Sequence, residues 1–487
     1  MNLKGLKFLY TFLYLITASI GANGQTVEWS NTQKLRGNSI FTTVIGQDES
    51  GIYVLRHRNK LLSKFIVLER YRQNLGLENS KSYLLKNTRI LYSDINEAGL
   101  LLIKQVYDKK ANIYKIIATS LSSNFETVIP ETVLMQIKST EWKTDPQFII
   151  RPSFDHQNYF ILNYEISNSK SHICRYTSIN NRLRVNNAGE FILNSNLNIE
   201  TITDIVIDKD LHYSLLAVSK RNKNDLKALT LIEQSGDTNI IKLVSDDIHS
   251  LEQPILYYNI FKDEKGISGF YTSSLQNGFE GNFSYSWKNL KLEPVLILKH
   301  PFSVSLLKEI AGETRAQSGF LPVTYQSLKV ICRTDGGFIK ISENAFIQKD
   351  QDIMAINGVP ATQGKNIYSF ENIIIQNFDS LGKPDWEGWV IKNQNTVNDG
   401  GLLGSVFISV TPSSFNILFN DPITTGGDIV LARFLHGGQR EVKVVAKGDE
   451  MNAFMIPSEG KQISSDKIIV PVLKDRKFAL LKITFKQ

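Results

Sequence analysis

Short apolar segments separated by polar turns follow one another along almost the whole chain. The first unit has apolar segments at 41–45 and 52–55 with a turn at 48–51 between them, and a third apolar segment at 65–69. Apolar runs of this length, bounded by turn residues, are typical of β-strands. The same order of segments returns further along the chain, with turns at 96–99, 155–158, 208–210, 263–266, 335–337, 411–414 and 474–476.

The composition of these turns and the spacing of the units indicate the architecture. Asp, Asn, Ser and Gly predominate at the turn tips, because such residues adopt positive φ or bond their own backbone. The third strand of each unit recurs about every 50 to 60 residues, with one interval near 90, which suits four short antiparallel strands and their connections. The sequence therefore predicts an all-β protein, namely a β-propeller of eight blades with four antiparallel strands each. Seven blades are the alternative.

The two ends of the chain complement each other. Residues 27–30 look like a strand without a partner, and the last unit stops after its third strand at 478–483. Pairing these two segments would satisfy two otherwise unpaired edges and close a ring. We therefore expect the N-terminal strand to complete the last blade of a single propeller domain over residues 25–487.

Two insertions depart from the repeat and account for the one long interval. The first, at about 301–326, contains 305–311, whose apolar residues have helical spacing and predict a short helix. The second, at about 343–370, is polar and ends in Tyr368 and Phe370. Long insertions in a repeat protein map to one face and often carry binding, but surface insertions also accumulate without function. Binding loops and insertions without function are both compatible with this pattern.

The N-terminus has the order of a secretory signal peptide. Lys4 and Lys7 precede an apolar run, which ends in small residues at 21–24. The run has about 14 apolar residues, whereas a transmembrane helix needs roughly 20. We predict that 1–24 is cleaved off after Gly24 and that the protein is exported to the periplasm, the cell surface or the extracellular space. No second apolar stretch is long enough to predict a transmembrane segment.

The charge of the chain gives no indication of a nucleic-acid partner. The formal charge of +7 becomes +5 when Lys4 and Lys7 are removed. The basic clusters at 56–60 and 221–223 fall at predicted turns, where charged side chains are usually solvated. No nucleic-acid binding is therefore expected.

The chain has two cysteines, Cys174 and Cys332, and both lie in apolar strand-like segments. Two cysteines are too few to form the disulfide framework of a chain of this length. We expect buried free thiols, with a single disulfide as the alternative.

No motif for catalysis, for a cofactor or for a metal is present. The histidines, which never pair at metal-ligand spacing, are His57, His156, His172, His212, His249, His300 and His436. No Gly-x-Ser-x-Gly turn or phosphate-binding loop occurs, and the acids at 350 and 352 lack the distal Glu of a calcium loop. The tryptophans Trp29, Trp287, Trp386 and Trp389 are expected to pack between strands and blades, with stacking on a sugar as the alternative. The sequence thus predicts no catalytic, cofactor-binding or metal-binding residue, and it leaves the binding residues unidentified.

One unit carries a family resemblance. An Asp-Gly turn at 335–337 is followed by three isoleucines at 373–375, a Leu-Gly turn at 381–382 and Trp386. This arrangement resembles the secreted β-propeller-like proteins of the Bacteroidota, a largely uncharacterised group. The resemblance is clear in the sixth unit and degenerate in the others. It implies a propeller and export, and it carries over no site residue.

Two hypotheses of function follow. The first is an exported, non-catalytic binding or scaffold protein that presents loops on a rigid ring to a protein or glycan partner. The second is a carbohydrate-active enzyme, a glycoside hydrolase or lyase, with carboxylates gathered at the central channel, since two acids from distant blades would leave no motif in the sequence. Carboxylates that converge in a cleft would favour the enzyme.

Overall fold

The computed structural model of the chain describes residues 25–34, 41–57, 65–138, 146–166, 171–193, 195–220, 226–235, 238–246, 248–288, 297–356, 359–423, 427–447, 453–474 and 477–485. The predicted signal peptide at 1–24 and the basic cluster at 221–223 lie outside the described residues.

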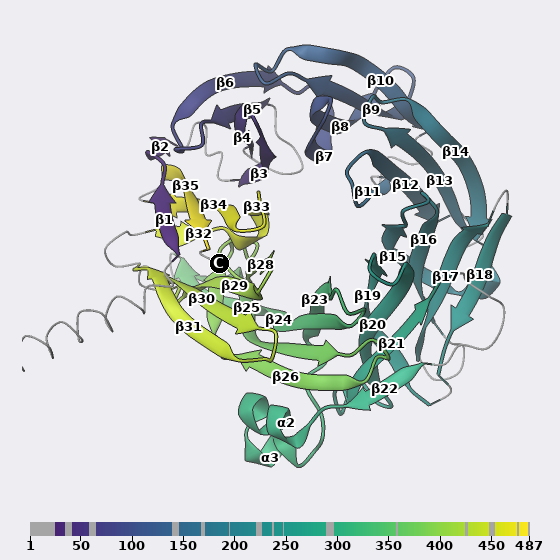
Figure 1. The fold of residues 1–487 in the computed structure, drawn as a ribbon, viewed down its shortest axis with the longest axis vertical. Coiled ribbons are helices and arrows are strands. Elements are labelled where there is room, and N and C mark those ends of the chain that lie inside the picture. The colour runs from purple at the N-terminus through teal and green to yellow at the C-terminus, as the bar shows by residue number, and fades with distance from the viewer. Residues whose placement is uncertain are drawn as a thin grey trace, which may run out of the picture.

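Eight antiparallel sheets surround a common centre and form an eight-bladed β-propeller, which confirms the predicted fold (Figure 1). In the first seven blades the first strand lies nearest to the centre (Figure 1). The first four blades comprise β3 (Phe41–Asp48), β4 (Gly51–His57), β5 (Phe65–Tyr71) and β6 (Leu77–Leu84); β7 (Thr88–Asn96), β8 (Gly99–Asp108), β9 (Ile113–Leu121) and β10 (Thr127–Lys138); β11 (Gln147–Pro152), β12 (Asn158–Ile166), β13 (His172–Asn180) and β14 (Val185–Leu193); and β15 (Ile199–Ile207), β16 (Tyr213–Lys220), β17 (Lys227–Ser235) and β18 (Thr238–Val244).

The next three blades follow the same order along the chain. They comprise β19 (Ser250–Asn259), β20 (Glu264–Thr272), β21 (Gly281–Trp287) and β22 (Leu298–Pro301); β23 (Tyr325–Cys332), β24 (Phe338–Ile356), β25 (Val359–Phe378) and β26 (Pro384–Val390); and β28 (Phe407–Thr411), β29 (Ser414–Asp421), β30 (Asp428–Leu435) and β31 (Arg440–Ala446). The eighth blade is built from β32 (Ala453–Met455), β33 (Lys461–Gln462), β34 (Lys467–Lys474), β35 (Lys477–Thr484) and two N-terminal strands, β1 (Thr26–Trp29) and β2 (Gln33–Lys34).

The N-terminal strand closes the ring, as predicted from the sequence. β1 pairs antiparallel with β35, and Val27 lies opposite Ile483 while Trp29 lies opposite Leu481. Beyond the strand, the backbone N–H of Ser30 donates to the carbonyl of Leu480 over 2.9 Å. The outer edge of the last C-terminal strand is therefore paired, which satisfies backbone groups that would otherwise form an open sheet edge.

The burial of the strands explains why the apolar segments are continuous rather than alternating. All seven residues of the second strand β4 are buried, whereas most residues of the outermost strand β6 are exposed. A strand that is covered on both faces loses the alternation of apolar and polar residues. Apolar clusters lie at every junction between neighbouring blades, including the junction between the eighth blade and the first. The core is thus a series of layers between blades.

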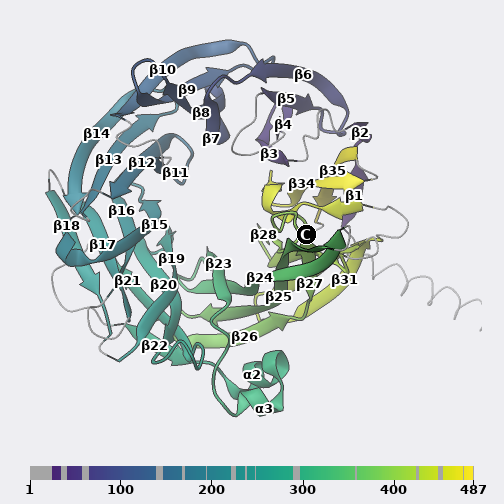
Figure 2. The same cartoon turned by 180° about the vertical axis from the view of Figure 1, so that it is seen from behind.

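The two insertions differ in structure. The helix predicted in the first one is α2 (Val304–Ala311), whose N-cap Ser303 accepts the backbone N–H of Leu306, and α3 (Glu313–Ala316) follows. The segment at 343–370 is no separate loop: β24 and β25 simply continue beyond the blade as a paired hairpin, and β27 (Gln394–Val397) adds a third strand to it (Figure 2). Short 3-10 turns occupy Ser195–Leu197 and Pro457–Glu459.

The basic cluster at 56–60 is only partly the solvated turn that the sequence predicts. Arg56 and His57 belong to β4, and the Arg56 side chain is 2% exposed. Its guanidinium lies 2.7 Å from the carboxylate of Glu69 and 5.0 Å from the ring centre of Phe478 in the eighth blade. The prediction fails at Arg56 because the neighbouring blade covers that face of the strand.

Both cysteines are free, as expected. Cys174 is buried and Cys332 is half-buried, and burial raises the pKa of each thiol to about 12. In the part of the chain that the structure describes, no helix has the length and apolar character needed to cross a bilayer.

Candidate functional site

The junction between the fifth and sixth blades is packed differently from the others. Its apolar residues form two separate clusters, one around Phe270 beside α2 and one made of Tyr257, Phe338 and Phe378. Between these clusters lies Lys340, which is fully buried and donates to the Oδ1 of Asn282 over 2.8 Å. A polar layer thus interrupts the core at this junction.

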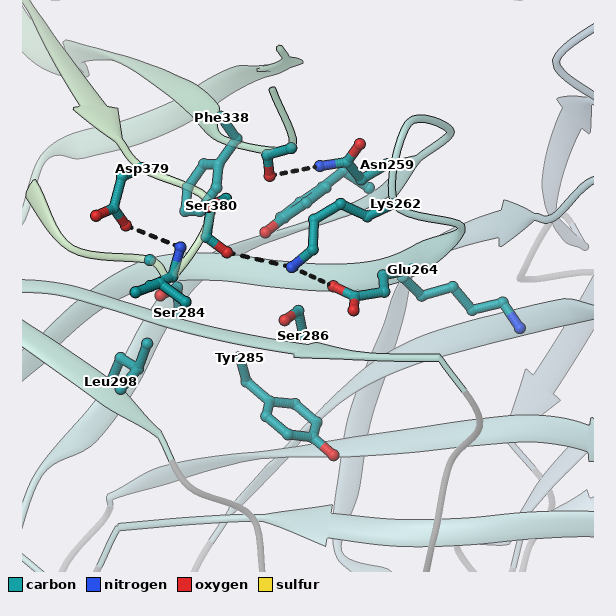
Figure 3. A pocket seen from close by; sticks show the side chains of 15 residues that line it. Asn259, Lys262, Glu264, Ser284, Tyr285, Ser286, Leu298, Phe338, Asp379 and Ser380 are labelled. Atoms are coloured by element: carbon teal, nitrogen blue, oxygen red, sulfur yellow. Dashed lines mark hydrogen bonds and ion pairs between the residues drawn. The ribbon is translucent and has the colours of Figure 1, made fainter. Parts of the chain in front are cut away.

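A pocket of about 350 Å³ opens at this junction, on the side where the β19–β20 and β23–β24 turns lie (Figure 3). It is called the interblade pocket below. Its lining residues are Tyr257, Asn259, Lys262, Glu264, Lys265, Ser284, Tyr285, Ser286, Leu298, Gly336, Phe338, Asp379, Ser380, Leu381 and Gly382. A volume of this size suits a small ligand or one residue of a larger partner.

Glycines make room for the lining side chains. A Cβ at Gly266 would lie 2.3 Å from the Cζ of Tyr257, which faces it in the paired strand. A Cβ at Gly382, where φ is +77°, would lie 2.8 Å from the Cδ1 of Leu298. Glycine in a strand or turn often marks a close approach of this kind. Because Gly266 has no side chain, the Tyr257 ring can lie against it. This ring and the Phe338 ring, whose centres are 5.3 Å apart, form what is called below the aromatic floor of the pocket.

Hydrogen bonds between the turns fix the rim of the pocket. Lys262 lies 2.7 Å from the carboxylate of Glu264 and donates to the carbonyl of Ser380 over 3.2 Å, which joins the two blades (Figure 3). Asn259 donates to the carbonyl of Gly336 over 3.0 Å. The cation and the acid at the rim thus neutralise each other, and the pocket presents no unpaired charge from this pair.

Several hydroxyl groups in the pocket, among them those of Tyr257, Ser284 and Ser286, have no hydrogen-bond partner among the described residues. Ser284 and Ser286 lie two apart on β21, so both point to the same face of that strand. Neither these serines nor Tyr257 forms a side-chain hydrogen bond with the residues that the structure describes. Burial raises the pKa of Tyr257 well above its usual range, so its phenol stays protonated. The pocket therefore offers neutral hydroxyl groups above an aromatic floor.

Two large apolar side chains are exposed in the turns around the interblade pocket. Leu381 in the turn after β25 is 70% exposed, and Phe261 in the turn after β19 is 53% exposed. Exposed apolar groups beside a formed pocket are typical of contact surfaces. Neither residue belongs to the insertions singled out from the sequence, because both look like ordinary turn residues there.

Three side chains of the kinds that ligate metal ions also lie close together in the β15–β16 turn. One ligand atom each of Asp208, Asp210 and His212 lies within 4.8 Å of the others. However, Asp208 lies 2.9 Å from the ammonium of Lys265 and accepts the backbone N–H groups of Asp210 and His212. The turn itself accounts for the cluster, and we infer no metal site from it.

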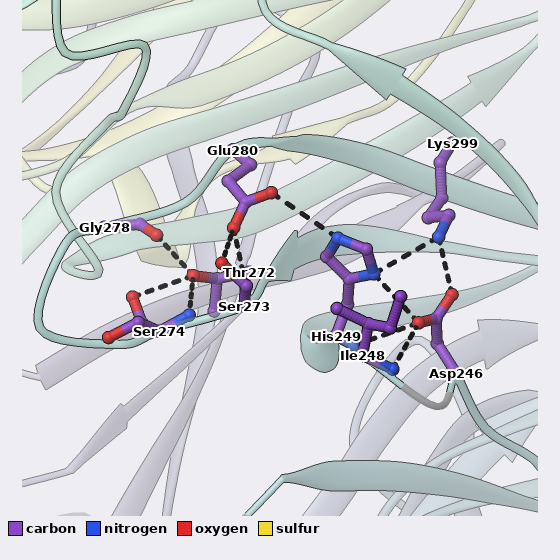
Figure 4. A network of polar contacts seen from close by, with 9 residues as sticks. All are labelled: Asp246, Ile248, His249, Thr272, Ser273, Ser274, Gly278, Glu280 and Lys299. Carbon is purple, nitrogen blue, oxygen red and sulfur yellow. Dashed lines mark hydrogen bonds and ion pairs between the residues drawn. The ribbon is translucent and has the colours of Figure 1, made fainter.

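A polar network lies on the opposite side of the fifth blade (Figure 4). Asp246 accepts the backbone N–H groups of Ile248 and His249, and it lies 2.6 Å from the ammonium of Lys299. His249 Nε2 lies 3.5 Å from Glu280. Burial acts to raise the pKa of Asp246, but the hydrogen bonds from Lys299 and His249 hold it far below its usual range. These groups satisfy one another, so the network fastens the β18–β19 connection in place.

A second pocket, of about 380 Å³, lies among the innermost strands of the second, third and fourth blades and is called the central pocket below. Its lining residues are Arg89, Ile90, Leu91, Tyr92, Pro146, Gln147, Phe148, Ile149, Ile150, Arg151 and Thr203. These lining residues include two arginines and no carboxylate. This pocket, which is one part of the centre of the ring, thus has no acid among its lining residues.

No protein-family model matches the chain, and no curated protein matches its sequence. Among solved structures, the WD40 domain of SCAP from fission yeast matches with a TM-score of 0.41 and 9% identity, covering 95% of this chain and 98% of that chain. The polysaccharide lyase Uly1 matches with a TM-score of 0.36 and 9% identity, covering 91% of this chain and 90% of that chain. A DUF4221 family member from Bacteroides vulgatus matches with a TM-score of 0.32 and 11% identity, covering 94% of this chain and 98% of that chain. Similarity at this level assigns neither a ligand nor an activity.

Proposed function

We propose that the protein is an exported, non-catalytic binding protein that holds its partner at the interblade pocket. The observation that carries this proposal is the group of hydroxyls beside an aromatic floor, including those of Tyr257, Ser284 and Ser286, that form no hydrogen bond with the described residues. Tyr257 and Ser284 are buried residues and Ser286 is exposed. A ligand bound in the pocket would supply these hydroxyl groups with hydrogen-bond partners in place of solvent.

The chemistry of the pocket favours holding a ligand over reacting with it. Glu264 is paired with Lys262, and Asp379 accepts the backbone N–H groups of Leu381 and Lys383 over 2.8 Å each. Neither acid is thus free to act as a general base, which would have to reach a substrate proton directly. A neutral ligand rich in hydroxyl groups, such as a glycan, matches the pocket best.

A protein partner would use the same site in another way. Phe261 and Leu381 supply apolar contact area around the pocket, as interface anchors do. The enzyme hypothesis has less support from the two pockets, because the acids of the interblade pocket are already hydrogen-bonded and the lining of the central pocket contains no carboxylate.

The experiment measures binding to a glycan array and capture of envelope proteins by the tagged protein. We expect Ser284→Val with Ser286→Val to weaken glycan binding about tenfold or more, since each lost hydrogen bond costs about 1 kcal/mol. Ser80→Val with Ser82→Val is the matched control, because these serines are also two apart on an outer strand and both are exposed. Equal binding by both double variants, or no binding by the unaltered protein, would contradict the proposal.

Export needs its own test. The proposal rests on Lys4, Lys7 and the apolar run that follows them. We expect the full-length chain, expressed in a Gram-negative host, to yield a protein that begins at Gln25 and fractionates outside the cytoplasm. Mass spectrometry that finds residues 1–24 still attached would refute it.

A further inference from the structure

The central pocket has a chemical character opposite to that of the interblade pocket. Its lining includes Arg89 on β7 and Arg151 on β11, at the innermost strands of two neighbouring blades. Arg89 is half-buried and Arg151 is exposed.

The Arg151 guanidinium is held in place by hydrogen bonds that use only some of its N–H donors. Its Nε and Nη2 donate to the Oδ1 of Asp204 over 3.1 and 2.8 Å, and its Nη1 donates to the carbonyl of Ile150 over 3.1 Å. A guanidinium has five N–H donors, so two remain for another acceptor. Asp204 balances the charge of Arg151 and fixes the orientation of its planar group.

Arg89 has no such partner. It is half-buried, and its side chain forms no hydrogen bond or ion pair with any residue in the described part of the chain. Among the described residues, the two arginines together with Asp204 therefore carry one net positive charge. Phe148, which also lines this pocket, adds an apolar surface.

We propose that the central pocket binds an organic anion, whose carboxylate, sulfate or phosphate group is held by Arg89 with help from Arg151. Charge-assisted hydrogen bonds from a guanidinium to such oxygens are short and strong, and the planar group favours two parallel bonds. The Phe148 ring would contact the apolar part of the ligand. This site lies at other blades than the interblade pocket and is independent of the function proposed above.

The test is calorimetric titration of the mature protein with glucuronate, glucose 6-sulfate, glucose 6-phosphate and, as a neutral match, glucose. We expect at least one of the anions to bind, glucose not to bind at the central pocket, and Arg89→Ala to weaken anion binding about tenfold or more. Raising the salt from about 0.05 to about 0.5 M should weaken it further, because screening shortens the reach of the charge. Preference for glucuronate or for the tetrahedral esters identifies the anionic group.

Matched variants distinguish anion binding at the central pocket from general effects of charge, from binding at the interblade pocket and from loss of folding. Arg182→Ala removes an exposed arginine in the β13–β14 turn and should leave anion binding unchanged. Ser284→Val with Ser286→Val should also leave it unchanged, so failure of one proposal does not imply failure of the other. Thermal unfolding checks each variant, and Arg89→Gln replaces Arg89→Ala if the latter does not fold. Anion binding that survives loss of the Arg89 charge, or that is absent altogether, would overturn the proposal.

Discussion

The ammonium of Lys461 in the eighth blade lies 3.7 Å from the Oδ1 of Asp94 in the second blade, although the first blade lies between them in the ring. Asp94 is 2% exposed. Its Oδ2 lies 2.5 Å from the Nδ1 of His156 and accepts the hydroxyls of Tyr92 and Tyr159 over 3.3 Å each. One carboxylate thus connects three blades.

We expect Asp94→Asn to lower the free energy of unfolding at neutral pH by about 1–3 kcal/mol, because it weakens a buried set of charge-assisted hydrogen bonds. Burial acts to raise the pKa of Asp94, but the hydrogen bond and charge of His156, and the charge of Lys461, hold it below its usual range. A carboxyl with a lowered pKa stabilises the fold above its unfolded pKa, and this contribution is lost as the pH falls through the folded value.

Urea unfolding at several pH values measures the contribution of Asp94 to the free energy of unfolding. The difference between the unaltered protein and Asp94→Asn should be largest near neutral pH and should shrink below about pH 4. Asp210→Asn, at an exposed acid, is the control and should change stability little. A difference that stays constant down to acid pH would contradict the role assigned to Asp94.

Lys340 predicts a rise of stability with pH as well, but in the alkaline range. Burial holds its pKa well below the ordinary value of 10.5, so between the lowered pKa and 10.5 the unfolded chain binds more protons than the folded protein. The stability of the unaltered protein should therefore rise with pH relative to Lys340→Met, by up to about 1.4 kcal/mol per pH unit. Urea unfolding between about pH 7 and 10 tests this. Lys109→Met, at an exposed lysine, is the control, and parallel curves for all three proteins would show that Lys340 is charged in the fold.

Gly266→Ala should disturb the floor of the interblade pocket. Because the added Cβ would meet the Tyr257 ring at 2.3 Å, the ring must move, and overpacking of this kind costs about 1–3 kcal/mol. Thermal unfolding should show a lower midpoint temperature, and the glycan array should show a loss of binding. Gly364→Ala is the matched control, because nothing lies within 4 Å of its added Cβ. Unchanged binding by Gly266→Ala would mean that Tyr257 does not shape the binding site.

Val27→Asp should weaken the ring closure. Val27 packs against the apolar cluster between the seventh and eighth blades, and an unpaired carboxylate there would cost about 2 kcal/mol or more. Thr26→Asp makes the same change at the exposed neighbouring position of β1 and should cost far less. Limited proteolysis and urea unfolding compare the two. Equal effects would indicate that β1 contributes little to the stability of the ring.

The sequence predicts the blades well because their signals are local. Turn residues and strand lengths are properties of a few consecutive residues, and the unpaired segments at both ends are enough to predict β1 beside β35. The order of strands in each sheet then follows from the short connections.

The site could not be predicted in the same way. In β24, Lys340 and Ser342 alternate with Ile339 and Ile341, which suggests a strand with one solvated face. The neighbouring blade covers that face, so the polar residues are buried as well. The lining of the interblade pocket comes from turns that look like any others, and it is assembled only when two blades meet. Arg56 fails as a predicted surface charge for the same reason.

Because β1 is hydrogen-bonded to β35, the first described strand of the chain belongs to the same sheet as the last. The eighth blade cannot acquire its outermost strand until residues 477–484 have been synthesised. Closing the ring therefore requires two segments that lie more than 400 positions apart in the sequence, and neither can complete the eighth blade without the other.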